Sequence, residues 1–200
     1  EVDDILYEAD AFQPVFLQML HNDKNVLERL NQDWEQENDD PKFDLFRRKL
    51  ETEFLKEDIN PSGKLVLFSE SVDTLTYLQE RLTHELGRTD VLMVTASNRN
   101  RLGQVIKENF DANYQSDSRR YNLIITSDVL AEGVNLHRSN VIVNYDSPWN
   151  ATRLMQRIGR VNRIGSVAPC IYNYMFYPSQ QGDKEIKLYK NALVKLQGFH

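Results

Sequence analysis

Residues 64–177 alternate short, continuous apolar runs with stretches of helical periodicity, and this alternation constrains the fold more than any other feature. The uninterrupted runs are 64–68, 91–94, 123–126 and 141–145, and residues 171–177 alternate like one further strand. Strands of this kind are buried on both faces, and helical connections between them place the strands in parallel. We predict an α/β fold in which helices cover both faces of a parallel sheet.

Helical spacing of apolar residues marks the connecting segments. It predicts helices over residues 71–86, from Leu102 to Phe110, over about 152–163 and, last, from Ile186 to Leu196. In sheets of this class, ligands bind at the carboxyl ends of the strands. The loops that follow Phe68, Val94, Thr126 and Tyr145 are therefore the candidate binding region.

The first sixty residues show helical periodicity and no motif with chemistry of its own. One helix is predicted by the spacing of Val26, Leu27, Leu30 and Trp34, and a second by that of Phe43, Phe46, Leu50 and Phe54. The turn residues 60–63 are expected to end the second helix. We therefore predict a helical accessory arm over residues 1–60 and the α/β domain over residues 61–200.

Composition excludes several classes of protein. The single cysteine, Cys170, excludes a disulfide framework, and the four histidines show no metal-ligand spacing, so we predict no metal site. No apolar run approaches the ~18 residues of a membrane span and no signal-peptide pattern opens the chain, so we expect a cytoplasmic protein without a membrane partner. Because the chain starts at Glu1, we expect it to be part of a longer polypeptide.

The net charge of −6 conceals an asymmetry along the chain. Residues 1–60 hold 17 acidic and 7 basic side chains, whereas residues 61–200 hold 13 acidic and 17 basic ones. Within residues 99–163 the bases are nine arginines and Lys107, and arginine is favoured where a flat, forked donor binds phosphate or carboxylate. By charge count alone, an anion-binding surface and a solvated face with ion pairs both remain open.

The strongest local pattern is Gln-Arg-Ile-Gly-Arg-Val-Asn-Arg-Ile-Gly over residues 156–165. On a helix, Gln156, Arg160 and Arg163 fall within one arc, Arg153 joins it one turn earlier, and Arg157 points away. Guanidinium groups gathered on one face repel one another unless an anion meets them. The pattern therefore favours anion binding over a surface helix that pairs with acids elsewhere, and we expect the loss of Arg157 to be milder than that of Arg163.

This stretch resembles motif VI of superfamily-two helicases and translocases, and other motifs of that family follow in the family's order. Residues 64–70 resemble motif IV, residues 94–97 with Arg101 and Phe110 resemble motif IVa, residues 127–136 resemble motif V, and residues 146–150 resemble the link before motif VI. The resemblance covers residues 64–177 and implies the second, RecA-like lobe of a helicase or translocase motor. Glu132, Asn135 and Gln156 replace residues typical of DEAD-box proteins, so the resemblance is closest to the Swi/Snf-type branch.

The resemblance also implies a role for individual residues. Arg160 and Arg163 would be arginine fingers that reach the phosphates of ATP, and Gln156 would orient a phosphate or the attacking water. The implied nucleotide contacts are Gly133, Asn135 and Asp128, and the implied contacts to the nucleic-acid backbone are Ser69, Ser97, Arg101 and Ser127. The implied partners are nucleic acid, with DNA favoured over RNA, and the N-terminal RecA-like lobe of the same polypeptide.

A first lobe would supply the phosphate loop and the acidic box that hold ATP and Mg²⁺, and this sequence contains neither motif. We therefore expect an ATP-dependent helicase or translocase whose isolated second lobe hydrolyses no ATP. Two other interpretations remain. One is a catalytically inactive RecA-like module that binds nucleic acid or protein, and the other is an unrelated α/β nucleotide-sugar transferase that holds a diphosphate with these arginines.

Overall fold

The computed structural model describes residues 12–37, 39–115, 118–130, 133–148, 150–177 and 179. The chain divides into two compact units, residues 1–46 and residues 47–200. The predicted helix from Ile186 to Leu196 lies outside the described residues, as does Glu132. The predicted domain boundary at residue 60 stays a prediction.

The first unit contains helix α1 (Pro14–Gln36) and the start of helix α2 (Pro41–Lys49). Proline occupies the first turn of α1, where a helix needs no backbone donor. At the start of α2, the Asp40 carboxylate accepts a hydrogen bond from the Phe43 backbone N–H at 2.8 Å, which satisfies one of the donors left over at a helix start. Both helices predicted for this region are present.

Helix α2 continues as a short π-helical segment, η2 (Leu50–Phe54), and ends there rather than at the predicted turn 60–63. Asn60 gives the physical reason, because its buried side-chain amide donates to the carbonyl oxygens of Phe54 and Lys64, each at 3.0 Å. One amide thus caps the end of η2 and holds the start of the first strand beside it. The Phe54 ring packs on Tyr174 of the last described strand, with ring centroids 4.5 Å apart.

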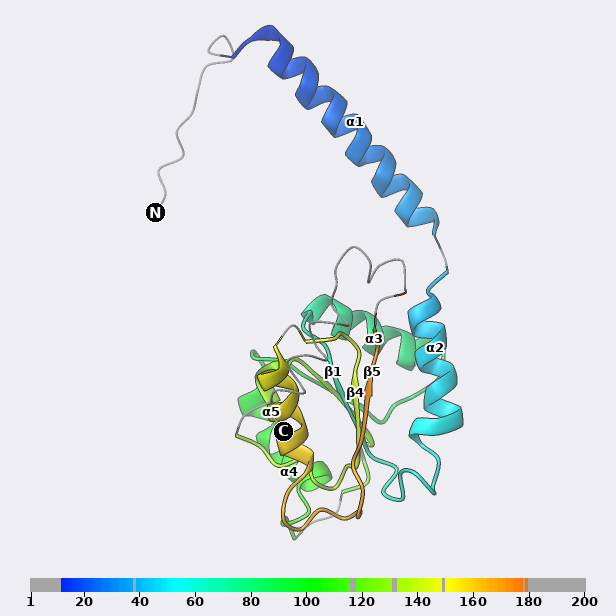
Figure 1. Cartoon of the computed structure of the whole chain (residues 1–200), viewed down its shortest axis with the longest axis vertical. Helices are drawn as coiled ribbons and strands as arrows, with labels where there is room; N and C mark the ends of the chain where they lie inside the picture. Colours follow the sequence, from blue (N-terminus) through cyan, green and yellow to red (C-terminus); the bar gives the residue numbers. More distant parts are fainter. Residues whose placement is uncertain are drawn as a thin grey trace. The chain divides into compact units, whose positions relative to one another are not determined.

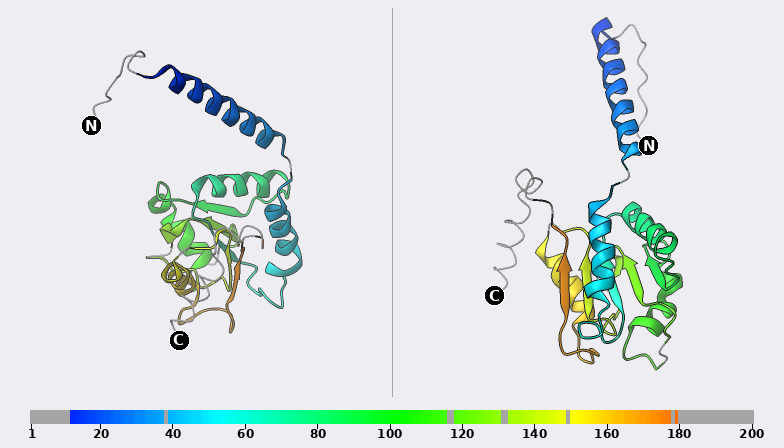
Figure 2. Two further views of the ribbon diagram at one scale, coloured as in Figure 1. Left: turned by 45° about the horizontal axis from the view of Figure 1, so that its top comes forward. Right: turned by 90° about the vertical axis from the view of Figure 1, so that its right-hand side faces the viewer.

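Five strands form one parallel sheet in the second unit (Figure 1). They are β1 (Leu65–Phe68), β2 (Val91–Val94), β3 (Leu123–Thr126), β4 (Val141–Asn144) and β5 (Tyr172–Met175), in the order β2-β3-β1-β4-β5. Each of the first four consists mostly of buried residues, as their apolar sequence predicts. Figure 2 shows the same sheet from two further directions, with β5 in orange at one edge.

Helices cover both faces of this sheet, which confirms the predicted RecA-like α/β class. Helix α3 (Val72–His84) lies on one face, and α4 (Arg99–Phe110) and α5 (Ala151–Val161) lie on the other (Figure 1). On the α4 and α5 side, alternate strand residues form one apolar core with the helices; its members include Val66, Phe68, Ile124, Ile142, Ile106, Phe110 and Val161. Helix α5 ends at Val161, so Arg163 lies beyond the helix on which its position was projected.

Candidate nucleotide and nucleic-acid site

The strands end in register, which gathers the predicted nucleic-acid contacts along one edge of the sheet. Phe68 pairs with Thr126 and Asn144, and Thr126 pairs with Val94. The loops that follow these residues carry Ser69, Ser127 and Ser97, and Arg101 lies on the first turn of α4. Ser97 and Arg101 are exposed and Ser127 is half-buried, so these three side chains can be reached from solvent.

Ser69 is the exception in this set because it is fully buried. Its hydroxyl donates to the carboxylate of Asp146, which also accepts a hydrogen bond from the Glu70 backbone N–H at 3.3 Å. Asp146 comes from the loop after β4, so this contact joins the ends of two adjacent strands. A contact between Ser69 and the nucleic-acid backbone stays a prediction. The Ser69 hydroxyl could donate to a phosphate only if its hydrogen bond to Asp146 were broken.

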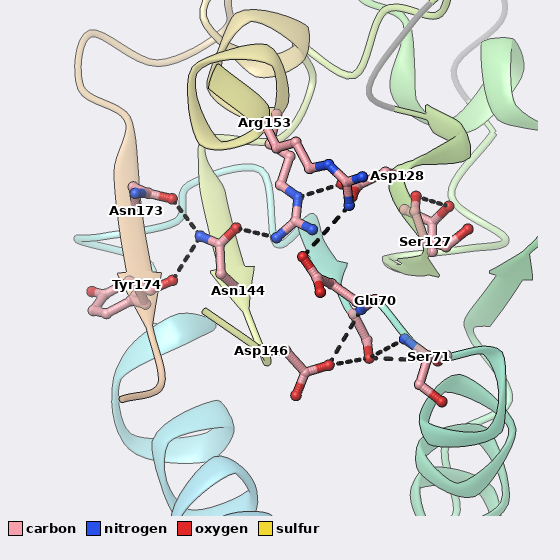
Figure 3. A network of polar contacts seen from close by, with 12 residues as sticks. Glu70, Ser71, Ser127, Asp128, Asn144, Asp146, Arg153, Asn173 and Tyr174 are labelled. Carbon is pink, nitrogen blue, oxygen red and sulfur yellow. Dashed lines mark hydrogen bonds and ion pairs between the residues drawn. The ribbon is translucent and has the colours of Figure 1, made fainter. Parts of the chain in front are cut away.

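Asp128, in the 3₁₀ turn η3 (Asp128–Leu130), holds two arginines of α5 (Figure 3). Arg157 donates from Nε to Asp128 Oδ1 at 2.7 Å, and Arg153 donates from Nη1 to Asp128 Oδ2 at 3.1 Å. Arg153 also lies 3.6 Å from the Glu70 carboxylate. The sequence grouped Arg153 with Arg160 and Arg163, but Arg153 shares the partner of Arg157, because residues four apart on a helix reach the same carboxylate.

Arg157 is fully buried and extends the contacts of Asp128 into the sheet. Its Nη1 donates to Asn144 Oδ1 at 3.0 Å, and its guanidinium lies over the Phe68 ring at 5.0 Å. The Asn144 amide donates onward to Asn173 Oδ1 at 2.8 Å and to the Tyr174 carbonyl at 3.0 Å (Figure 3). These contacts connect η3, α5, β4 and β5 through buried polar groups.

Arg163 and Asn135, both predicted from the motif pattern, are brought together beyond the end of α5. Arg163 donates from Nη1 to Asn135 Oδ1 and from Nε to the Gly159 carbonyl, the latter at 3.1 Å. Arg163 remains exposed. Asn135 in turn donates from Nδ2 to Asp111 Oδ2 at 3.2 Å. The guanidinium is therefore held in place while part of its surface stays accessible to an anion.

Arg160 and Gln156 are half-buried on α5. The Arg160 carbonyl accepts a hydrogen bond from the Leu136 backbone N–H at 2.9 Å, which ties the segment before β4 to the helix. Gly133 has a φ of +74°, a conformation that L side chains rarely adopt, and a Cβ atom there would lie 2.7 Å from Nη2 of Arg99. The backbone at Gly133 thus lies directly beside Arg99, an arginine that the sequence motifs did not single out.

Two further residues at this site, Asp111 and His137, also escaped the sequence analysis. His137 is fully buried, and its Nδ1 lies 3.7 Å from Asp111 Oδ1. Burial lowers the pKa of His137 below its ordinary value, the Asp111 carboxylate raises it in part, and Arg163 and Arg138 lower it further. The only sequence signal was position, since Asp111 directly follows the predicted helix that ends at Phe110.

The described residues were also searched for features of other classes of site. They hold no group of three or more histidine, cysteine or acidic residues that could bind a metal ion. Among them, no helix has the length and apolar character needed to cross a bilayer. The guanidinium groups of Arg160 and Arg163 are cationic, and together with the neutral Asn135 amide they offer N–H donors. This combination of charge and donors fits the phosphates of a nucleotide.

Comparison with known proteins agrees with this architecture. Two curated relatives are the Bacillus subtilis (strain 168) protein described as uncharacterized ATP-dependent helicase YqhH and the Dictyostelium discoideum protein described as probable ATP-dependent RNA helicase ddx51. The first is 49% identical over 43 residues, covering 22% of this chain and 8% of that protein. The second is 27% identical over 114 residues, covering 56% and 20% respectively. The chain thus spans a minor part of each relative's length.

Solved structures show the same fold. The C-terminal part of the Fun30 ATPase domain matches with a TM-score of 0.58 and 20% identity, over 88% of this chain and 52% of that one. S. cerevisiae Dbp5 bound to RNA and ADP BeF3 matches with a TM-score of 0.53 and 20% identity, over 76% and 36%.

The model of the family described as helicase conserved C-terminal domain matches residues 42–165, which include every motif from β1 to the end of the arginine-rich segment. The branch within the superfamily stays a prediction. With its parallel sheet, its ordered motifs and this match over more than half its length, the chain belongs to the helicase conserved C-terminal domain family.

Proposed function

We propose that the chain is the second motor lobe of an ATP-dependent helicase or translocase of the Swi/Snf-type branch. The observation that carries the proposal is the position of Arg163, which is exposed just beyond the end of α5 while Asn135 and the Gly159 carbonyl hold its guanidinium. A guanidinium fixed in this way can meet the phosphates of a nucleotide that a first lobe presents. ATP bound there would supply the phosphoryl group whose transfer releases energy.

Arg160 and Arg163 would stabilise the negative charge that develops on the phosphates as the terminal bond breaks. Gln156, half-buried on the helix that carries Arg160, would orient a phosphate or water, and Gly133 would let the backbone approach the nucleotide. Mg²⁺ would be held by the first lobe. Chemistry of this kind depends on positioning, so the contacts that fix Arg163 matter as much as its charge.

Asp128 was predicted to contact the nucleotide. Its carboxylate binds Arg157 and Arg153, so we propose that it acts by holding η3 and α5 in a fixed relation. In this role Asp128 would keep η3 aligned with the helix that carries Arg160. A direct nucleotide contact by Asp128 would require one of the arginines to move.

The carboxyl edge of the sheet would bind the nucleic-acid backbone through Ser97, Arg101 and Ser127. Contacts to phosphate carry no base information, so binding would be independent of sequence. DNA is the proposed partner, because the motif residues resemble those of the Swi/Snf-type branch. We also propose that the protein is located in the cytoplasm.

The test is Arg163→Ala in the complete polypeptide that carries this lobe. Loss of an arginine finger lowers turnover by roughly 10³–10⁵, so we expect kcat for ATP to fall within this range and KM for ATP to change by only a few-fold. Arg48→Ala is the matched control, because Arg48 is an exposed arginine of α2 that lies outside every motif. Wild-type turnover in the Arg163→Ala protein would favour the inactive-module interpretation instead.

A further inference from the structure

Asp111, at the end of α4, is held by its own local turn. Its backbone N–H donates to the Lys107 carbonyl at 3.1 Å, its Oδ1 accepts from the Asn113 backbone N–H at 3.0 Å, and its carbonyl accepts from the Tyr114 N–H at 3.1 Å. The residue is 9% exposed. These contacts fix the direction of the second carboxylate oxygen, Oδ2, without any help from the residues that carry the motifs.

That second oxygen determines how the Asn135 amide is turned. A carboxylate has oxygen acceptors only, so Asn135 must present its Nδ2 donor to Asp111 Oδ2, and this bond is 3.2 Å long. The Asn135 carbonyl oxygen is then turned to the opposite side, where Arg163 Nη1 donates to it. With the amide reversed, an N–H donor would face a guanidinium that also has only donors, and the contact would be lost.

His137 does not replace this function. It lies 3.7 Å from Asp111 Oδ1, beyond hydrogen-bond distance, and neither of its ring nitrogens has a hydrogen-bond partner among the described residues. The Asp111 carboxylate therefore receives its side-chain hydrogen bond from Asn135. This leaves one continuous set of contacts that runs from α4 through Asn135 to the guanidinium of Arg163.

We propose that Asp111 is a positioning residue for the motor: it orients the Asn135 amide so that Asn135 holds the Arg163 guanidinium ready for phosphate. The inference rests on the proposed function, because it adds a residue that acts through the arginine finger. Neither the motif pattern nor the family match assigns this role to Asp111.

Asp111→Asn in the complete polypeptide is the first variant. The Asn113 N–H and Asn135 Nδ2 donate to two different oxygens of Asp111, and the new amide has an oxygen at only one of these two positions, so the orientation of Asn135 is no longer imposed. A misplacement of about 1 Å can cost about 10²-fold in rate, so we expect kcat for ATP to fall by about that factor while KM changes by only a few-fold. Glu108→Gln is the matched control, because the Glu108 side chain contacts only Gln104 on the outer side of α4 among the described contacts.

The swapped pair, Asp111→Asn together with Asn135→Asp, separates positioning from stability. In the swapped protein, the amide N–H at position 111 donates to one oxygen of the carboxylate at position 135. The other oxygen of that carboxylate still accepts from Arg163. We expect the swap to recover most of the lost kcat. A kcat that stays as low in the swap as in Asp111→Asn, or a kcat for Asp111→Asn that equals that of Glu108→Gln, would overturn the inference.

A cycle with Arg163→Ala distinguishes this inference from the proposed function. If Asp111 acts through Arg163, then Asp111→Asn lowers kcat no further in the Arg163→Ala background, whereas full additivity refutes the inference alone. If Arg163→Ala itself leaves turnover unchanged, the proposed function fails. Should thermal unfolding show that Asp111→Asn is not folded at the assay temperature, Asn135→Ala removes the same link and takes its place in the cycle.

Discussion

Arg157 lies fully buried against Asp128, with 2.7 Å between Nε of the arginine and Oδ1 of the aspartate. A buried guanidinium is costly unless its donors are satisfied, and Arg157 meets most of this need with Asp128, Asn144 and the ring of Phe68, while its Nη2 has no hydrogen-bond partner among the described residues. The sequence indicated only that Arg157 points away from the proposed fingers. The structure shows that Arg157 points toward Asp128 and Asn144, and its contacts with them join η3, α5 and β4.

Arg157→Ala is therefore expected to destabilise this lobe strongly. Removing one member of a buried pair costs about 3–5 kcal/mol. Asp128 is 25% exposed and keeps Arg153, whereas the buried Asn144 Oδ1 loses its donor, so we expect a loss near the lower end of this range. Urea unfolding of the 200-residue chain measures the loss. Arg153→Ala, which removes an arginine from the same carboxylate but at a side chain 52% exposed, is the matched control and should cost less than about 1 kcal/mol.

Equal losses in these two variants would contradict the importance of burial at this pair. The expected result also changes how turnover data are to be interpreted. A low ATP turnover in an Arg157→Ala protein would reflect loss of folded lobe, so Arg157 cannot serve as the mild comparison for Arg163 that its position on a helical projection suggests.

His137 should make the stability of the lobe depend on pH. Burial, the largest cause, lowers the pKa of His137 in the folded state, so below about pH 6.5 the unfolded chain takes up a proton that the folded chain excludes. The free energy of unfolding is then expected to fall as pH decreases from about 6.5 toward the folded-state pKa, by at most about 1.4 kcal/mol per pH unit. Urea unfolding across this range measures the slope.

His137→Leu should flatten that slope. His84→Leu, at an exposed position near the end of α3, is the matched control and should leave the slope as it is in the wild type. A slope that persists unchanged in His137→Leu would show that other groups are responsible for the loss of stability in mild acid.

Arg101→Ala should weaken the binding of nucleic acid by the complete polypeptide and reduce its dependence on salt. Each phosphate contact contributes about 0.7–0.9 to the slope of log affinity against log salt concentration, so the slope should decrease by about that amount. Fluorescence anisotropy with a labelled DNA over a salt series measures it. Arg120→Ala removes the same charge near the opposite end of the strands, where Arg120 lies over the Tyr121 ring, and should leave the slope unchanged.

A reduction of the slope by both variants would indicate general attraction to a basic protein rather than a contact at the carboxyl edge. A labelled RNA of the same sequence, run in parallel, tests whether DNA is the preferred partner.

The sheet could be predicted because each buried strand carries the apolar residues that cause its burial. A strand buried on both faces must be mostly apolar, so runs such as the first three residues of β3, Leu123, Ile124 and Ile125, stand out against their polar surroundings. The end of the second helix was not predictable in this way. It depends on the Asn60 side chain, whose two acceptors, the Phe54 and Lys64 carbonyls, lie on either side of it in the sequence.

The candidate site shows the same division. Arg163 and Asn135 were found because they belong to a recurring pattern, whereas Asp111 lies in a polar loop where one acidic residue looks like any other. Arg153 was grouped with Arg160 and Arg163, yet it binds Asp128, the carboxylate that Arg157 also binds, and a helical projection, which gives directions only, does not reveal this shared partner. The projection does not show how far a long side chain can extend or where Asp128 lies in the fold. It also does not apply to Arg163, because α5 ends at Val161.

The central place of β1 in the sheet has a consequence for how this lobe is made. Of the described strands of this lobe, β1 is the first to leave the ribosome, yet its two neighbours, β3 and β4, begin only at Leu123 and Val141. During synthesis, the most apolar strand therefore waits with both edges unpaired until most of the lobe has emerged. Pairing between such distant segments is slow, and exposed strand edges invite association with other chains. Nascent chains that stop before Val141 should be the species that most need a chaperone.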